Sequence, residues 1–324
     1  AQAKKPSLLP GTLATPELLS FIVFSKFYQA LPFYRIEELF RLQEVDLKRG
    51  TMANWLVKLS EKLQPIWNLL EEWVLDSGYM AIDATSVQVL KEDGRRPETK
   101  STMWARGSPE KGIVLFDYKT SGGGPAAKKL VQGFKGALQA DAHRGYESLD
   151  ETEILRLGCM MHARRRFHKA YVSAQKKSGL AENGLKMFKR LYRFEEAYKK
   201  QNLTSQQRYE ARLQEVKPYL EKIKTWCEKK KSRVLPSSPL GNAIHYFLNE
   251  YDELSAFLND GRYEIDNGWV ERNIKNFAIG RKNWLFADTT EGAHASSLYY
   301  SLVITAKLNG KDPFETMTQI LKEL

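Results

Sequence analysis

The chain has 324 residues, of which 42% are hydrophobic and 27% charged, as is typical of a folded globular protein. No apolar run reaches the ~18 residues that a membrane-spanning helix needs, and two cysteines, Cys159 and Cys227, are too few for a disulfide framework or a cysteine zinc site. Lys and Arg outnumber Asp and Glu by 50 to 39, a net charge of +11 that favours a polyanion such as nucleic acid, although charge alone fits a membrane surface or an acidic protein equally well.

The beginning of the chain predicts a helical N-terminal region over residues 1–76. Thr15, Pro16 and Glu17 form a typical capped helix start, with proline at the first helical position. Apolar residues at helical spacing follow from residue 18 to 43, and a second helix is predicted to start at residues 48–51. These helices could grip DNA or could buttress the next domain.

Five strands are predicted between residues 77 and 165, because alternating, β-branched segments replace the helical period. A short helix, PAAKKLVQGF, is expected between the third and the fourth strand. The predicted strands are GYMAIDATSVQVL (78–90), STMWARGS (101–108), GIVLFDYKT (112–120), GALQADA (136–142) and LGCMMHA (157–163). This order indicates an α/β fold built on a mixed sheet.

The remainder of the chain reads as helical. Residues 166–260 are predicted to be a basic helical insertion, with Pro236 and Pro239 breaking its longest run. Residues 261–324 return to the α/β part with two helices, over 266–287 and 296–310.

Three acidic residues have unusual surroundings. Asp83 lies in the middle of an apolar strand, where an unpaired carboxylate is costly to bury. Asp141 ends another apolar strand, and Glu271 lies in the first turns of a helix. An aspartate at a strand end, such as Asp141, often only forms a turn, and a glutamate at a helix start, such as Glu271, often only compensates the helix dipole. If the three carboxylates lie close together, however, they repel one another without a cation and suit Mg²⁺, which prefers oxygen ligands.

The surrounding segments resemble the insertion-sequence-66 family of bacterial transposases. The resemblance covers DATSVQVL at Asp83, GALQADAHRGYESL at Asp141, GCMMHARRRF, and EIDNGWVERNIKNFAIGRKNWLFA around Glu271. It extends to LLPGTLATPELLSFIVFSKF near the start and to SLYYSLVITAKLNGKDP near the end, so it spans nearly the whole chain in order.

The resemblance implies a ribonuclease-H-like core with a DDE triad at Asp83, Asp141 and Glu271. These carboxylates would hold Mg²⁺, with Mn²⁺ as a substitute, and two ions are expected. The implied reaction is hydrolysis of one strand at each transposon end, followed by attack of the freed 3′-hydroxyl on target DNA. Because water and the 3′-hydroxyl are the nucleophiles, no covalent intermediate is needed, in agreement with the lack of a convincing Ser/His/Asp set.

The resemblance also marks candidate DNA-binding residues around these acids. Arg281 and Lys282 would hold the DNA backbone, and Trp284 either stacks on an unpaired base or fills the core, the latter being favoured. A basic solvated helix face is the alternative for the residues near His162. The full candidate set is His162, Arg164, Arg165, Arg166, Arg272, Lys275, Arg281 and Lys282.

The sequence departs from the family pattern at three positions and at the front. Ala84 stands where an acid is usual, Ser86 where proline is usual, and Gly268 where a second asparagine is usual. Each adjoins a triad member and could lower activity. Full-length relatives carry a cysteine-rich, zinc-binding N-terminal region that this sequence lacks, so we expect recognition of the transposon ends to be lost with it.

Two other functions stay open at this point: another ribonuclease-H-like nuclease, such as a junction resolvase, and an inactive transposase-derived DNA-binding protein. The expected partners are transposon and target DNA, further copies of the chain on DNA, and accessory proteins of the same element, but no membrane. The start of the chain lacks a signal-peptide pattern. We therefore expect a bacterial cytoplasmic protein associated with the nucleoid.

Overall fold

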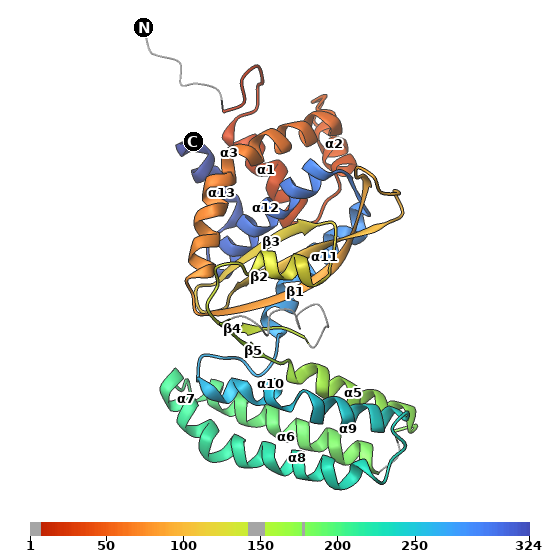
Figure 1. Cartoon of the computed structure of the whole chain (residues 1–324). Helices are drawn as coiled ribbons and strands as arrows, with labels where there is room; N and C mark the ends of the chain where they lie inside the picture. Colours follow the sequence, from red (N-terminus) through yellow and green to blue (C-terminus); the bar gives the residue numbers. More distant parts are fainter. Residues whose placement is uncertain (1–7, 142–152, 177–178) are drawn as a thin grey trace. The chain divides into compact units, whose positions relative to one another are not determined.

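The computed structural model describes residues 8–141, 153–176 and 179–324. The chain divides into two compact units (Figure 1). Unit 1 comprises Ala1–Phe134 and Trp269–Leu324, and unit 2 comprises Lys135–Gly268. The described residues form a mixed α/β fold with parallel and antiparallel strand pairs, as expected for a ribonuclease-H-like protein.

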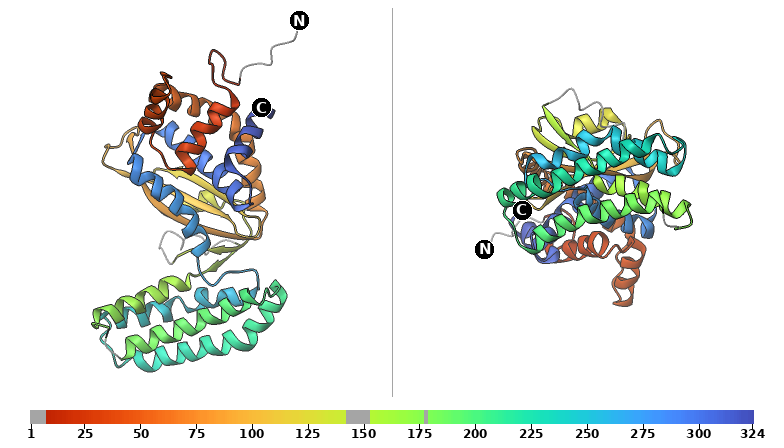
Figure 2. Two further views of the ribbon diagram at one scale, coloured as in Figure 1. Left: turned by 180° about the vertical axis from the view of Figure 1, so that it is seen from behind. Right: turned by 90° about the horizontal axis from the view of Figure 1, so that it is seen from below.

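Unit 1 combines a sheet with helices from both ends of the chain. Three antiparallel strands lie in the order β3-β2-β1, and a short strand, β6, pairs in parallel with β1. The view from behind in Figure 2 shows α1, α11 and α12 over one face of this sheet. The elements are α1 (Pro16–Val23), the π-helical turn η1 (Phe24–Tyr28), α2 (Phe33–Leu42), α3 (Arg49–Leu75), β1 (Tyr79–Lys91), β2 (Lys100–Ser108), β3 (Ile113–Lys119), α4 (Gly124–Leu130), α11 (Gly268–Trp284), β6 (Ala287–Thr289), α12 (Thr290–Leu308) and α13 (Pro313–Glu323).

The predicted start of the first helix is confirmed. The Thr15 hydroxyl caps α1 by accepting a hydrogen bond from the Leu18 amide at 3.2 Å, and Pro16 occupies the first helical position. This bond satisfies one of the amides that a helix N-terminus leaves without an intrahelical partner. The apolar side of α1 then enters the core through Leu19, Ile22 and Val23.

The outer edge of β3 is closed by hydroxyl groups of α12. The Phe116 amide donates to Ser301 Oγ at 2.8 Å, and the Val114 amide donates to Thr305 Oγ1 at 3.1 Å. Ser301 Oγ also accepts from the Trp67 indole of α3 at 3.1 Å. Edge strands otherwise present unpaired backbone groups to other chains, so α12 both covers the sheet and protects its edge.

Unit 2 contains a short parallel strand pair and a helical bundle. Strands β4 (Gly136–Gln139) and β5 (Ile154–Leu157) precede helices α5 (Met160–Ser173), α6 (Leu180–Lys200), α7 (Ser205–Ala211) with the π-helical turn η3 (Arg212–Val216), α8 (Lys217–Lys231), α9 (Pro239–Asn249), α10 (Tyr251–Ser255) and the 3₁₀ turn η4 (Ala256–Asn259). Aromatic residues fill the bundle: the Phe188 ring lies 5.0 Å from Phe167 in a tilted contact and 5.6 Å from Phe247 in an edge-to-face contact.

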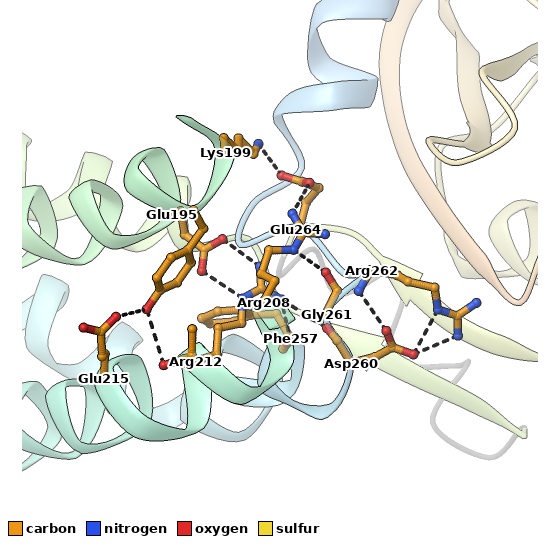
Figure 3. Close-up of polar contacts among 12 residues, drawn as sticks. Glu195, Lys199, Arg208, Arg212, Glu215, Phe257, Asp260, Gly261, Arg262 and Glu264 are labelled. Carbon is orange, nitrogen blue, oxygen red and sulfur yellow. Dashed lines mark hydrogen bonds and ion pairs between the residues drawn. The ribbon is translucent and has the colours of Figure 1, made fainter. Parts of the chain in front are cut away.

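A buried ion-pair network joins the bundle to the loop after η4 (Figure 3). The fully buried Arg212 guanidinium bonds both carboxylate oxygens of Glu195, at 2.9 and 2.7 Å. Its remaining nitrogen donates to the carbonyls of Phe257 and Asp260, both at 3.1 Å. Because the Arg212 side chain binds a carboxylate of α6 and two backbone carbonyls of the loop at once, the network fixes the path of the chain after α10.

Three predictions about secondary structure need correction. The expected strand over residues 157–163 is wrong: β5 ends at Leu157, and α5 begins at Met160 after an extended Cys159. A short apolar run does not distinguish a strand from a buried helix start. The predicted five-stranded sheet omitted the three-residue β6, and α13 was not predicted. The sequence also predicts a polar turn with His143, Arg144 and Gly145 after the strand that ends at Asp141, and these three residues lie outside the described part of the chain.

Candidate catalytic site and nucleic-acid interface

Asp83 lies on the face of β1 that α11 covers. Side chains alternate along a strand, so Asp83 shares its face with Ala81 and Val87, both part of the hydrophobic core of unit 1. Thr85, two residues further on the same face, accepts a hydrogen bond from Arg281 of α11. Asp83 itself is partly buried, and its Oδ1 accepts from the Ala84 amide at 2.8 Å.

Glu271 lies in the first turn of α11 and is partly buried. The helix buries Val270, Ile274 and Phe277 in the same core to which β1 contributes. At its other end the Arg281 guanidinium donates to Thr85 Oγ1 at 3.0 Å and also bonds Ser86 of β1. Two of the three predicted triad carboxylates, those of Asp83 and Glu271, therefore come from a strand and a helix that share one core.

Asp141 belongs to unit 2, where it follows β4 and is partly buried. Two residues before it, the buried Gln139 amide group donates to the carbonyls of Gly158 at 3.2 Å and Glu264 at 2.9 Å. Glu264 precedes Glu271 by seven residues along the chain. Unit 2 thus ties the strand end that bears Asp141 to the segment that leads into the helix bearing Glu271.

The segment entering α11 is held by further bonds within unit 2. The Met160 amide donates to the Ile265 carbonyl at 3.2 Å, and the Asn267 amide donates to Cys159 Sγ at 3.3 Å. Asp266 Oδ1 accepts from the Gly268 amide at 2.9 Å, which satisfies an amide at the helix start. Its other oxygen accepts from the Tyr192 hydroxyl at 2.7 Å, and burial together with this carboxylate raises the pKa of Tyr192.

Gln139 and Asp266 were not among the residues predicted from the sequence. A signal existed for each. Gln139 is a polar residue inside the apolar segment GALQA, and Asp266 precedes Asn-Gly at a helix start. Neither signal reveals the partner, because the Gln139 amide bonds a carbonyl 125 residues away.

The candidate DNA-binding residues of α5 lie on its surface, except for the partly buried His162. Arg164 has its guanidinium 5.7 Å from the Tyr192 ring of α6, and Arg166 has its own 4.0 Å from the Tyr246 ring of α9. Arg165 is also exposed. Cation–π contacts orient the guanidinium groups of Arg164 and Arg166 while leaving their N–H donors able to bind phosphate.

On α11 the candidates divide into two groups. Arg272, Lys275 and Lys282 are exposed, whereas Arg281 is partly buried and bonds β1 as described above. Trp284 packs against the core, with its ring 5.5 Å from Phe277, so the favoured packing role is confirmed.

Comparison with known proteins identifies the family. The family model described as "Transposase IS66 family" matches residues 11–295. The chain belongs to the IS66 transposase family. Transposases of this family are DNA-processing enzymes of the DDE type, which generally use divalent metal ions.

Relatives of this chain include three proteins of Sinorhizobium fredii (strain NBRC 101917 / NGR234), each named as an uncharacterized protein. The first, y4qI, is 30% identical over 100% of this chain and 62% of its own length. The second, y4jD, is 29% identical over 100% of this chain and 65% of its own length. The third, y4hP, is 25% identical over 97% of this chain and 60% of its own length. The chain therefore spans about three-fifths of the length of these relatives. Among the helices of the described residues, none is long and apolar enough to cross a membrane.

Proposed function

We propose that this chain is the catalytic part of a DNA transposase that hydrolyses a phosphodiester at each transposon end and joins the freed 3′-hydroxyl to target DNA. Asp83, Asp141 and Glu271 are the proposed triad. The observation that carries the proposal is the position of Asp83 on the face of β1 covered by α11, the helix that bears Glu271, in a chain of the IS66 family. The bond from Gln139 to the Glu264 carbonyl supports including Asp141.

The donor set fits Mg²⁺ or Mn²⁺, with two ions proposed. All three side chains offer carboxylate oxygens, the ligands that these hard cations prefer, and all three are only partly buried. When bound, the cations would activate the attacking oxygen and stabilise the leaving oxygen. The chain itself contributes positioning: Arg281 fixes α11 on β1, and Asp266 fixes the start of α11.

The remaining parts of the proposal concern DNA and partners. The net charge of +11 supports a DNA partner, with the exposed cations of α5 and α11 contacting phosphates. On this proposal the chain acts on nucleoid DNA in the bacterial cytoplasm, as a multimer that brings two DNA ends together, with accessory proteins of the same element.

Metal binding tests the triad without knowledge of the DNA ends. We expect Mn²⁺ to raise the thermal unfolding midpoint, because a ligand at 100 times its Kd stabilises the folded state by about 2.7 kcal/mol. Asp83→Asn, Asp141→Asn and Glu271→Gln should each abolish most of this rise. The matched control Asp288→Asn, which removes an exposed carboxylate of unit 1, should leave it intact. An equal rise in all variants would refute the site.

The reaction is tested with a labelled duplex that carries the terminal sequences of the element. A product in which the labelled strand is joined to a second duplex, formed in Mg²⁺ and absent in Asp83→Asn, supports a transposase. Cleavage without joining would instead indicate another ribonuclease-H-like nuclease. DNA binding with neither product would indicate a DNA-binding relative that has lost the chemistry.

A further inference from the structure

Unit 2 carries most of the surplus positive charge of the chain. Residues 135–268 contain 25 Lys and Arg against 18 Asp and Glu, a net charge of +7, whereas unit 1 has a net charge of +4. The proposed triad and its neighbouring cations do not account for this surplus, because much of it lies on α6 and α8, away from α5 and α11 in sequence.

Helices α6 and α8 pack against each other in opposite directions. The Tyr219 hydroxyl of α8 donates to the Met187 carbonyl of α6 at 3.3 Å, and its ring lies 5.6 Å from Phe194. In the turn η3, just before α8, Glu215 accepts from the Tyr198 hydroxyl of α6 at 2.6 Å. The side of α6 that carries Phe194 therefore faces Tyr219.

Six exposed cations lie on the outer surface along this contact, and we call them the α6–α8 basic face. Helical periodicity places residues three, four and seven apart on one side of a helix. Arg190 marks that side of α6, because its guanidinium lies 5.1 Å from the Tyr219 ring. The members of the face are Lys186, Lys189, Arg190, Arg193, Lys222 and Lys229.

The acidic residues of α8 point away from this face. Glu221 accepts a hydrogen bond from the Tyr251 hydroxyl of α10 at 2.8 Å, which places it on the opposite side of the helix. Glu228 follows Glu221 by seven residues and shares that side. The two signs of charge are thus separated across α8, and the cations gather beside α6.

This positive charge is neutralised only in part within the protein. By the same helical spacing, Glu182 and Glu196 of α6 lie on the side of the face, and Glu196 pairs with Lys200 at 2.9 Å one turn from Arg193. Lys186 pairs with Glu182 at 2.8 Å, but in the described part of the chain no carboxylate lies within ion-pair distance of the other five cations. Arg190 and Arg193 are three residues apart, where like charges repel. Stacking on Tyr219 and Phe194 holds the Arg190 guanidinium in place, at a low entropic cost for binding an anion.

We propose that the α6–α8 basic face binds the phosphate backbone of duplex DNA. The proposal rests on the proposed function, since a transposase must hold DNA beyond the scissile bond. Lys186 and Arg193 are separated by about 10 Å along the axis of α6. Duplex DNA carries one negative charge per about 1.7 Å of its axis, so the face spans several phosphates. Charged contacts of this kind read no sequence.

The test measures affinity for a 30-base-pair fluorescein-labelled duplex of random sequence, in EDTA, between 50 and 300 mM NaCl. For Arg190→Gln/Arg193→Gln/Lys222→Gln we expect the slope of log K against log [salt] to become shallower by about 2.7, or roughly 0.9 per lost phosphate contact. The charge-retaining variant Arg190→Lys/Arg193→Lys/Lys222→Arg should keep the wild-type slope. That control separates lost charge from lost packing.

A second control removes the same charge from unit 1. Lys58→Gln/Lys62→Gln/Lys311→Gln changes three exposed lysines outside the face. It should change the slope of log K against log [salt] by less than about 1. An unchanged slope in the first triple variant, or an equal change in this control, would overturn the proposal. The assay contains no divalent metal. A shallower slope in the first triple variant therefore supports DNA binding by the α6–α8 basic face even if the triad carboxylates prove not to bind Mn²⁺.

Discussion

The Arg212 network should be the most sensitive polar feature of unit 2. Arg212→Met keeps most of the apolar stem but leaves the buried Glu195 carboxylate without its ion pair. Breaking a buried ion pair from one side costs about 3–5 kcal/mol. The carbonyls of Phe257 and Asp260 also lose a donor, at about 1–3 kcal/mol for each that water does not reach. We therefore expect a loss of at least about 4 kcal/mol, a large part of a typical unfolding free energy of 5–15 kcal/mol.

The double variant Glu195→Leu/Arg212→Met separates the two contributions. It removes both charges, so only the unsatisfied carbonyls remain, and it should be more stable than Arg212→Met by about 1–3 kcal/mol. Urea unfolding followed by far-UV circular dichroism gives the global free energy. Hydrogen-exchange mass spectrometry of residues 256–264 and of α6 reports local opening. A loss below about 1 kcal/mol in the single variant, or a double variant no more stable than it, would refute this reasoning.

Three further predictions concern single substitutions. Ser301→Ala removes the acceptor of a β3 amide and of the Trp67 indole and should cost about 2–4 kcal/mol in urea unfolding, whereas Ser296→Ala, which loses one bond within its own helix, should cost less than about 1 kcal/mol. Burial lowers the pKa of Lys26 from 10.5 to about 8, so the unfolded chain binds the lysine proton more tightly than the folded chain. The free energy of unfolding should therefore rise by roughly 3 kcal/mol between pH 8 and pH 10.5. Lys26→Met should abolish this rise, and the same pH dependence of the unfolding free energy in both proteins would contradict the prediction. Gly261→Ala would push a Cβ into the backbone of α7 and should lower the thermal midpoint by several degrees in a melting experiment.

The sequence predicted those elements whose signals are local. The hydroxyl and proline at residues 15 and 16 define the start of α1, and alternation with β-branched residues defines β1, β2 and β3. It failed where the signal was short: residues 157–163 offered one apolar run for two elements, and β6 has only three residues. The triad was proposed from the sequence, and its catalytic role stays a prediction.

Local chemistry along the chain was therefore determined by the sequence alone: the charge surplus, the helix caps, the strand periods and the motifs that placed the chain in its family. Tertiary structure decided which distant groups satisfy one another. Ser301 caps an amide 185 residues away, and Gln139 bonds a carbonyl 125 residues away. The physical reason is that a buried polar group is tolerated only with a partner, and folding, not sequence spacing, chooses that partner. The same holds for the α6–α8 basic face, whose cations come from two helices and gather only when these pack together.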